Sequence, residues 1–472
     1  MAVLFSRFPA IRQRAAWGGA GLGALTLLAG MVPALALAPP AAAATAATSA
    51  TAAPAATAAG CARPVAHPQG PFKIASDHRT VENANGTPFV SYGTTVPGLS
   101  QSNFATDPSY VKTVVDSKDV PKINATAQHW CANTVRLQVS QHDVTQNTTV
   151  DNGSCTTSAG EAFLNQALDK EVQTAEARKL AVVINDQTES DPLSTQEKDP
   201  TKATFTFWNC VTAHKESWGS GRTYAQDPNV IFDIFNEPHA DAGCATYPHY
   251  NMKLWRNGGQ GTCGPDQPKY QGMDAVAYHI RVYDHATNLL WVEGPGYANT
   301  LAGMDRGCAP AASCLITADL GPVVYSFHHP QISSASQANS TTWWDDFGYL
   351  VNHAEASGQA PVVAGEWTNF DAWLPPSSLK TNQTYAPYCW HGAPASVGNF
   401  LGYLQKIGVG MSAYQLAPPY LIKAAGKWTD TLNYTDHSWS DSYCSYTKGQ
   451  PASVPPPLGA GADILSWFQR EN

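Results

Sequence analysis

The sequence predicts an α/β protein whose single folded domain is a disulfide-bonded (β/α)₈ TIM barrel. Two observations carry this prediction: eight short runs rich in β-branched or aromatic residues recur from residue 70 onward, and helix-like stretches lie between several of them. The runs are nearly continuous in apolar residues, as expected for parallel strands buried on both faces. An open doubly wound sheet would give similar runs, but no dinucleotide-binding fingerprint follows the first one.

The expected strands are, in order, Pro88–Tyr92, Thr134–Val139, Leu180–Asn185, Val230–Phe235, Asn288–Val292, Val323–Phe327, Pro361–Gly365 and Gly408–Tyr414. The clearest helix is Gly160–Leu180, where apolar residues recur at helical spacing. A second helix is expected within Trp343–Gln359. The last helix, Ala462–Arg470, is expected to close the barrel.

The first 38 residues are predicted to be a secretory signal peptide. Arginines precede an apolar run from Ala15 to Ala38, and Ala-x-Ala cleavage sites follow. The run is long enough to span a bilayer, so an uncleaved membrane anchor is the alternative. Residues 39–60 are almost only Ala, Pro and Thr, which predicts a disordered linker. The folded domain is therefore expected to occupy residues 61–472 of a secreted, extracellular protein.

The charge balance excludes some partners. The chain has a formal net charge of -9, and 14% of its residues are charged. No basic stripe is present that could neutralise phosphates, which argues against nucleic acid as a partner. For the same reason we expect no membrane partner once the signal peptide has been removed.

All ten cysteines follow the predicted linker. An even number of cysteines behind an export signal predicts disulfide bonds, and the absence of any Cys-x-x-Cys pair argues against a zinc site. Cys308–Cys314 is the first expected pair, because it encloses a short loop. Cys244–Cys263 and Cys389–Cys444 are two further expected pairs, although sequence alone does not fix the connectivity.

Two glutamates directly follow predicted barrel strands. The stretch VIFDIFNEP places Glu237 after the fourth strand, and PVVAGEW places Glu366 at the end of the seventh. Residues at the carboxyl ends of barrel strands point into the mouth where active sites lie. A lone Asn-Glu-Pro could instead be a helix cap followed by proline. The second strand-end glutamate favours a functional pair.

Two carboxyl groups that face each other across a mouth are what cleavage of a glycosidic bond needs. One stays protonated to give a proton to the leaving oxygen, and the other is ionised to attack or stabilise the oxocarbenium-like centre. Burial and mutual repulsion would push their pKa values apart. The pair therefore predicts glycoside hydrolysis, a reaction for which we expect no cofactor.

These motifs resemble glycoside hydrolase family 5, the cellulase-type retaining glycosidases of clan A. The resemblance covers nearly the whole chain from about residue 72 to 470 and is specific at Arg136, Asn236, Glu237, Pro238, His328 and Glu366. It implies that Glu237 is the acid/base and Glu366 the nucleophile. It also implies that Asn236 holds the sugar 2-hydroxyl, and that Arg136 hydrogen-bonds Glu366 and keeps it ionised.

Arg136 and His328 also have structural interpretations. Arg136 could be an ion-pair partner within an apolar strand, and Glu366 is a suitable carboxylate for it, because an unpaired buried arginine is costly. His328 could be a satisfied core histidine, as we expect for His329. Strand alternation places the side chains of Ser326 and His328 on the same face of the strand. A small side chain within the strand and a polar one at its carboxyl end are what a barrel interior accommodates.

Departures from the family pattern predict a remodelled pocket. The family's third-strand histidine is missing, and that strand ends instead in Asn185, Asp186 and Gln187. Pro330 stands where the family usually has a tyrosine, two places after the sixth-strand histidine. The eighth-strand tryptophan is also missing, so Tyr414 or Gln415 must substitute for it. The two-carboxylate chemistry is unaffected, but cellulose cannot be assigned by analogy alone.

Aromatic rings are the other resource for holding a sugar, because the C–H faces of a pyranose lie against flat rings. Trp367, next to the predicted nucleophile, is the first candidate for substrate contact. Tyr414 is another, at the end of the eighth strand. Trp344 is expected to face inward on its helix.

The sequence therefore predicts a monomeric, secreted, retaining β-glycosidase that acts on a polysaccharide or oligosaccharide. A β-glucan is the predicted substrate, and endo-β-1,4-glucanase the predicted activity. Mannan, another β-glucan or a short β-glycoside cleaved from its end are alternatives with the same chemistry. An inverting hydrolase would need more widely separated carboxylates. An inactive glycan-binding barrel would be expected to lack one carboxylate, yet both are present.

Overall fold

The computed structural model describes residues 66–101, 107–145, 158–188, 197–241, 244, 250–263, 268–306, 308, 313–328, 338–353, 358–369, 393–417, 420–422 and 460–471. The predicted signal peptide, the predicted linker and the expected Cys389–Cys444 pair lie outside these residues. Within them, no helix combines the length and the apolar character that crossing a lipid bilayer requires.

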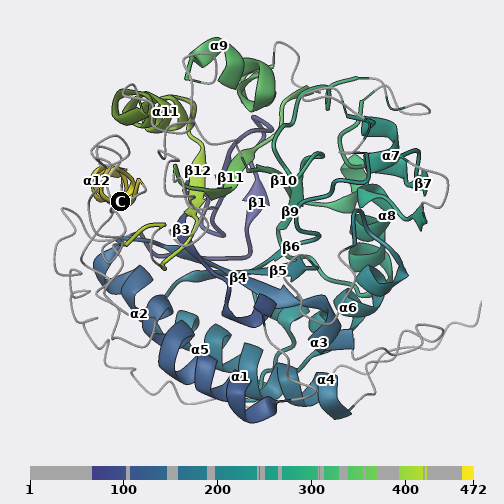
Figure 1. Cartoon of the computed structure of the whole chain (residues 1–472), viewed down its shortest axis with the longest axis vertical. Helices are drawn as coiled ribbons and strands as arrows, with labels where there is room; N and C mark the ends of the chain where they lie inside the picture. Colours follow the sequence, from purple (N-terminus) through teal and green to yellow (C-terminus); the bar gives the residue numbers. More distant parts are fainter. Residues whose placement is uncertain are drawn as a thin grey trace, which may run out of the picture. The chain divides into compact units, whose positions relative to one another are not determined.

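Eight parallel strands close into a barrel, which confirms the predicted fold class (Figure 1). Each strand pairs with the next barrel strand along the chain, and the last pairs with the first. The strands are β3 (Tyr92–Val96), β4 (Thr134–Ser140), β5 (Ala181–Gln187), β6 (Val230–Asp233), β9 (Leu290–Glu293), β10 (Val323–Phe327), β11 (Val362–Trp367) and β12 (Gly410–Ala413). All eight carboxyl ends therefore meet at one rim.

Helices surround the barrel (Figure 1). The α-helices are α1 (Pro108–Val114), α2 (Val120–His129), α3 (Gln141–Thr145), α4 (Ser158–Phe163), α5 (Asp169–Ala177), α6 (Lys202–Ala213), α7 (Met252–Asn257), α8 (Met273–Tyr278), α9 (Ser340–Trp343), α10 (Tyr349–Val351), α11 (Ala393–Ile407) and α12 (Gly461–Glu471). Short π-helical segments continue some of them, at Val115–Asp119, Leu164–Leu168, His279–Tyr283 and Trp344–Gly348. The helix predicted from periodicity, Gly160–Leu180, is confirmed by α4 to α5, and the predicted last helix, Ala462–Arg470, is confirmed by α12.

The first barrel strand lies later than predicted. The expected run began at Pro88, but β3 begins only at Tyr92. Pro88 instead forms a bridge to Glu82, and the ring of Phe89 stacks on Phe72 with a centroid distance of 4.4 Å. The apolar run is therefore buried, as its composition requires, but it is buried beneath the barrel and not within its wall.

A short hairpin, β1 (Lys73–Ile74) and β2 (Val81–Glu82), packs against this lower end of the barrel. The base cluster, as we name it, comprises Phe72, Phe89, Ala181, Val183, Ile231, Leu289, Trp291, Val324 and Val363. Alternate residues of β5 belong to different layers: Val183 joins the base cluster, whereas Val182 and Ile184 pack with the surrounding helices. A second hairpin, β7 (Gly259–Gln260) and β8 (Lys269–Tyr270), was not predicted either.

The C-terminal helix completes the ring of helices. Trp467 and Phe468 of α12 present ring edges to Tyr92 of β3, with centroid distances of 5.3 and 5.6 Å. Both side chains are fully buried. The last helix thus packs on the first barrel strand, as the predicted closure required.

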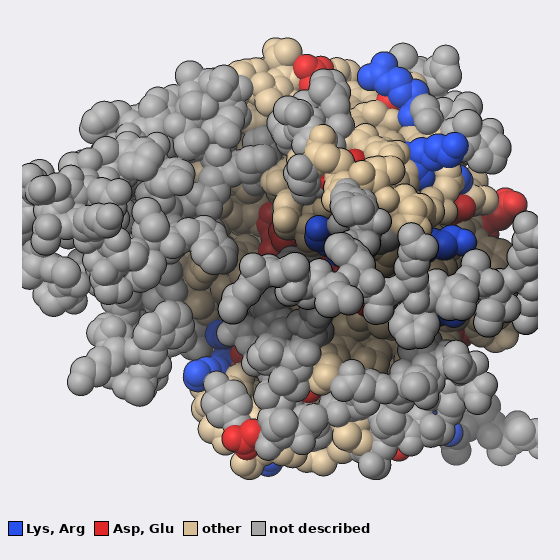
Figure 2. All heavy atoms as spheres, turned by 45° about the vertical axis from the view of Figure 1, so that its right-hand side comes forward, with Lys and Arg blue, Asp and Glu red and all other residues tan. Residues whose placement is uncertain are grey.

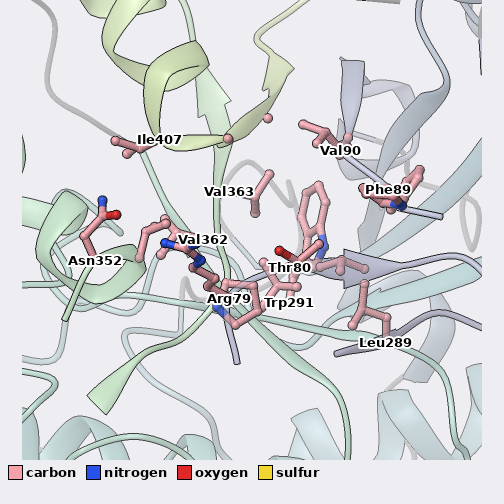
Figure 3. A pocket seen from close by; sticks show the side chains of 18 of the residues that line it. Arg79, Thr80, Phe89, Val90, Leu289, Trp291, Asn352, Val362, Val363 and Ile407 are labelled. Atoms are coloured by element: carbon pink, nitrogen blue, oxygen red, sulfur yellow. The ribbon is translucent and has the colours of Figure 1, made fainter. Parts of the chain in front are cut away.

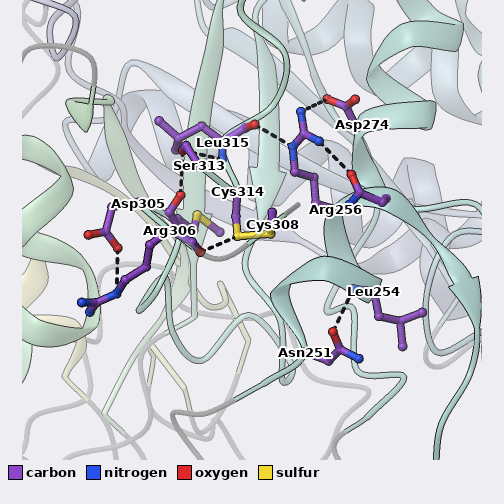
Figure 4. The surroundings of a disulfide bond; sticks show 12 residues. Asn251, Leu254, Arg256, Asp274, Asp305, Arg306, Cys308, Ser313, Cys314 and Leu315 are labelled. Carbon is purple, nitrogen blue, oxygen red and sulfur yellow. Dashed lines mark hydrogen bonds and ion pairs between the residues drawn. A yellow bond between two sulfur atoms is a disulfide. The ribbon is translucent and has the colours of Figure 1, made fainter. Parts of the chain in front are cut away.

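The expected disulfides Cys308–Cys314 and Cys244–Cys263 are both present. Figure 4 shows the first of them beside the side chain of Arg256, whose Nε donates to the Leu315 carbonyl at 2.8 Å. Arg256 also pairs with Asp274 at 3.4 Å. These contacts tie the segment between β9 and β10 to α7 and α8.

On the face shown in Figure 2, acidic and basic side chains both occur among the described residues. Within the described residues, a few large apolar side chains are exposed: Tyr278, Val282, Tyr283, Tyr297 and Trp344. The prediction that Trp344 faces inward is wrong, because it is 41% exposed. Its neighbour Trp343 turns inward instead and packs against Phe400 of α11.

Removing the Phe72 side chain should destabilise the barrel base. Phe72 is 3% exposed and stacks on Phe89, so Phe72→Ala should reduce the free energy of unfolding by about 3–5 kcal/mol. Denaturant unfolding followed by tryptophan fluorescence measures this. Tyr283→Ala, at a side chain that is 66% exposed, is the control and should change stability by less than about 0.5 kcal/mol. Equal stability of the two variants would contradict the assignment of Phe72 to the core.

Candidate active site

The candidate site is built around Arg136, which is completely buried on β4. Its Nε donates to Asp233 at 2.8 Å, and its Nη2 donates to Asn236 at 2.7 Å and to Glu293 at 2.8 Å. Its Nη1 donates to Glu366. One guanidinium therefore holds four groups from the ends of three strands, β6, β9 and β11, and these interactions compensate the cost of burying its charge.

Glu366 lies at the upper end of β11, and its side chain is 11% exposed. Its Oε1 accepts from Arg136 and, at 2.5 Å, from Nε2 of Gln138. Burial raises the pKa of Glu366, while the positive charges of Arg136 and His328 oppose that rise. The carboxylate is thus held in place by donors that favour its ionised form.

Gly365, just before this glutamate, lets β10 approach β11 closely. A Cβ atom at this position would lie 2.0 Å from Oγ of Ser326 and 3.1 Å from Nε2 of His328. Any larger residue would push these side chains away. The glycine in the motif PVVAGEW therefore has a steric role that the sequence pattern alone did not reveal.

Glu237 has an unusual backbone conformation. Strand β6 ends at Asp233, two residues before the predicted end, and Glu237 has φ of 49°. This left-handed conformation is rare for a residue with a side chain and costs on the order of 1–2 kcal/mol. The Glu237 N–H donates to Oε2 of Glu293 at 2.6 Å, which holds the strained backbone in place.

His328 connects the carboxylates. Its Nδ1 lies 2.9 Å from Oε1 of Glu237 and 4.0 Å from Oε2 of Glu366, and its Nε2 lies 3.3 Å from Oε1 of Glu293. Burial alone would lower the pKa of His328, but the negative charges of Glu293 and Glu366 outweigh burial and raise it well above its usual value. The surrounding carboxylates therefore favour the protonated form of this imidazole.

The two glutamates predicted from the sequence lie together at the rim. Carboxylate oxygens of Glu237 and Glu366 and a ring nitrogen of His328 all lie within 4.8 Å of one another. Carboxyl groups about 5–5.5 Å apart suit a retaining displacement, whereas an inverting one needs roughly 6.5 Å or more. The arrangement can therefore attack one face of an acetal carbon and protonate its leaving oxygen.

The same three side chains are close enough together to contact a cation, but their chemistry argues against metal binding. Protonation of His328, which the surrounding carboxylates favour, leaves the imidazole without a lone pair for a metal. In addition, Glu366 is already ion-paired with Arg136. The donor set is better suited to proton transfer than to holding an ion.

The two aromatic residues that were predicted to contact substrate lie in different environments. Tyr414 lies close to the carboxylates: burial raises its pKa well above the usual value, and the charge of Glu366 adds to that rise. Trp367, in contrast, is only 2% exposed, and its ring packs 4.5 Å from that of Phe400 in the helix layer. The structure thus places Trp367 in the core, away from the open rim, which corrects the expectation that it contacts substrate.

The last three side chains of the third barrel strand, β5, do not all point the same way. Asp186 turns toward the helices, where its Oδ2 accepts from Gln141 at 3.1 Å. Asn185 and Gln187 have the opposite orientation by alternation, and Gln187 pairs in register with Ser140 at the end of β4. Gln187 is therefore the residue of this strand placed toward the rim. Pro330 and His329 lie outside the described residues.

Sequence reasoning missed Asp233, Glu293 and Gln138. All three contact either Arg136 or Glu366. Glu293 follows an apolar run in LLWVEG, which is the same strand-end signal that identified Glu237 and Glu366. Asp233 interrupts the apolar run VIFDIF, and an acid within such a run signals a buried cationic partner.

Comparison with known proteins gives a family match. The model of the family described as Cellulase (glycosyl hydrolase family 5) matches residues 83–415. No curated protein sequence matches the chain.

Several solved structures are similar. A β-glucanase from Saccharophagus degradans in complex with cellotetraose is 16% identical, with 78% of this chain and 90% of that chain covered and a TM-score of 0.47. A Thermobifida fusca endoglucanase catalytic domain in complex with cellotetraose is 14% identical (85% and 97% covered, TM-score 0.43). A β-mannanase from Thermomonospora fusca is 12% identical (80% and 95% covered, TM-score 0.42).

Replacing Arg136 by methionine should destabilise the protein strongly. The change leaves buried carboxylates without their shared cation, so Arg136→Met should reduce the free energy of unfolding by about 3–5 kcal/mol. Denaturant unfolding at neutral pH measures the loss. Lys112→Met is the matched control, because it removes a cation from an exposed pair with Asp116 and should cost less than about 1 kcal/mol. A loss no larger than that of the control would show that Arg136 does not organise the site.

Proposed function

The chain belongs to glycosyl hydrolase family 5, and from this membership we propose that it is a retaining endo-β-1,4-glucanase. As a member of this family it is a glycoside hydrolase. The observation that carries the proposal of retention is the position of Glu237 and Glu366, whose carboxylate oxygens lie within 4.8 Å of each other and of His328. The family description, cellulase, supports a β-glucan as substrate.

In the proposed first step, an oxygen of Glu366 attacks the anomeric carbon while Glu237 gives its proton to the leaving oxygen. The bond between the anomeric carbon and that oxygen breaks, and a glycosyl ester of Glu366 forms. In the second step Glu237 takes a proton from water, whose oxygen attacks the same carbon and releases Glu366. Two inversions give net retention.

Neighbouring residues would support both steps. Arg136 and Gln138 hold Oε1 of Glu366, which leaves Oε2 for the attack. Asn236, whose Oδ1 accepts from Arg136, is proposed to hold the sugar 2-hydroxyl, and Tyr414 is proposed to contact the sugar. No step of this reaction calls for a cofactor.

Secretion is part of the same proposal. Residues 1–38 would be the cleaved signal peptide, residues 39–60 a linker and residues 61–472 the catalytic domain. The disulfides Cys244–Cys263 and Cys308–Cys314 support an oxidising destination, because such bonds persist outside the cytosol.

The substrate class can be tested with a panel of hexasaccharides. We expect cellohexaose to be cleaved at internal bonds into products of two to four sugars, and mannohexaose and laminarihexaose to be poor substrates. Chromatography of early products measures this. Faster cleavage of mannohexaose, or release of single sugars from one end, would replace the endo-glucanase proposal while leaving the two-carboxylate chemistry in place.

The roles of the two glutamates can be separated by covalent labelling. A 2-deoxy-2-fluoro cellobiosyl fluoride should add one glycosyl mass to the wild type but none to Glu366→Gln. Glu237→Gln should lose about 10²–10⁴-fold activity on cellohexaose. It should keep most of its kcat/KM on a dinitrophenyl glycoside, whose leaving group needs no proton, while kcat falls because the second step loses its base. Glu161→Gln, at an exposed glutamate of α4, is the control and should match the wild type. Labelling of Glu366→Gln would remove that residue from the nucleophile role.

The acid side of the pH profile should depend on His328. Glu366 must be ionised to attack, so kcat/KM should fall as the pH drops through its pKa. His328 opposes the rise of that pKa, so His328→Gln should raise it and move the acid limb to higher pH. His279→Gln is the control, because His279 contacts Asn209 in the helix layer and should leave the limb in place. An unchanged or lower limb in His328→Gln would contradict this electrostatic role.

A further inference from the structure

A pocket with a volume of about 350 Å³ lies at the base of the barrel (Figure 3). Its lining includes Leu289, Val324, Val362 and Gly410, which lie at the amino ends of β9 to β12. The candidate active site lies at the carboxyl ends of the same barrel. The pocket is therefore a separate site, and no role has been given to it so far.

The walls of the pocket are mostly apolar. Trp291, Phe89 and Val363, all members of the base cluster, line it. Its volume is at the lower end of the roughly 300–1,000 Å³ that small-molecule sites occupy. Aromatic and aliphatic walls of this kind suit the apolar body of a small ligand.

One buried polar group in the lining has no partner. Ser91, just before β3, is 6% exposed, and its hydroxyl makes no hydrogen bond to any residue that the structure describes. Buried hydroxyls are nearly always hydrogen-bonded, because an unmade bond costs about 1–3 kcal/mol. The hydroxyl of Ser91 is therefore available to a ligand in the pocket.

Among the described residues that line the pocket, the charged ones are all positive. They are Arg79 and Lys406, and none of these described residues is aspartate or glutamate, although the chain as a whole has a net charge of -9. Arg79 contacts Asp77 at 3.5 Å, but Asp77 does not line the pocket. Lys406 forms no ion pair with any described residue. The lining therefore favours an anion.

The pocket has polar and apolar side chains on one side and apolar side chains on the other. In Figure 3, Arg79, Asn352 and Val362 lie to the left, and Leu289 and Phe89 lie to the right. Ile407, the neighbour of Lys406 in the chain, lies on the side of Asn352. A ligand that fits this lining, with its two cationic side chains and its apolar walls, has a charged head and an apolar body.

We propose that the base of the barrel binds a small amphipathic anion, an aryl or alkyl carboxylate. The apolar body lies between Trp291 and Val363, and the carboxylate is held by Arg79 and Lys406. The hydroxyl of Ser91 donates a hydrogen bond to the ligand. This site is independent of the proposed hydrolysis, so its test does not depend on the outcome for Glu237 and Glu366.

Three probes that differ only in the head group test the charge preference. Calorimetric titration of the full chain should show binding of 4-phenylbutyrate, weaker binding of 4-phenylbutan-1-ol and no binding of 4-phenylbutylammonium. Lys406→Met and Arg79→Met should each weaken 4-phenylbutyrate binding by about threefold to tenfold. Lys112→Met removes the same charge from α1 and should leave the affinity unchanged.

Ser91→Ala separates binding from folding. Because the hydroxyl has no partner in the protein, the variant should unfold at the same denaturant concentration as the wild type or a higher one. It should nevertheless bind 4-phenylbutyrate about fivefold more weakly. A loss of stability in Ser91→Ala would show that the hydroxyl already has a structural partner and would count against the proposal.

The location of the ligand can be checked by crystallography with a bromophenyl analogue of the probe, whose anomalous signal should appear next to Trp291. Bromine at the rim near Glu366 would overturn the proposal. So would equal binding of the carboxylate and the alcohol, an affinity that none of the three pocket variants changes, or the absence of measurable binding.

Discussion

The buried positive charge of Arg136 is the constraint on which the candidate site depends. A guanidinium in the centre of a barrel must be neutralised and hydrogen-bonded, and here carboxylates from β6, β9 and β11 do so together. Because each of these carboxylates is fixed to a different strand, satisfying one side chain also fixes the relative positions of the strand ends. The geometry of the rim follows from that requirement.

His328 is the second basic group of the site. It lies between Glu237 and Glu293, so Glu293 contacts both Arg136 and His328. Glu293 in turn accepts from Arg136 and from the backbone of Glu237. The site is therefore a connected network, in which removing one member changes the pKa values of the others.

The fold could be predicted from the sequence because parallel barrel strands leave a strong signal, eight apolar runs with helices between. The first strand was misplaced because PFVSY is apolar for another reason: Phe89 stacks on Phe72 beneath the barrel. Glu237 and Glu366 could be proposed because each follows an apolar run in the sequence, although β6 ends at Asp233 and Glu366 lies within β11. Trp367 was misjudged because a ring next to a site residue can point to the opposite layer, and only the register and the bulge in β11 decide which.

The backbone of Glu237 has a consequence for engineering. A left-handed conformation suits glycine or asparagine better than glutamate, so the backbone preference and the acid/base role proposed for Glu237 oppose each other at this position. A directed-evolution campaign that selected only for heat resistance would be expected to enrich glycine there and, under the proposed mechanism, to yield stable barrels without activity. Libraries built on this chain should therefore keep codon 237 fixed.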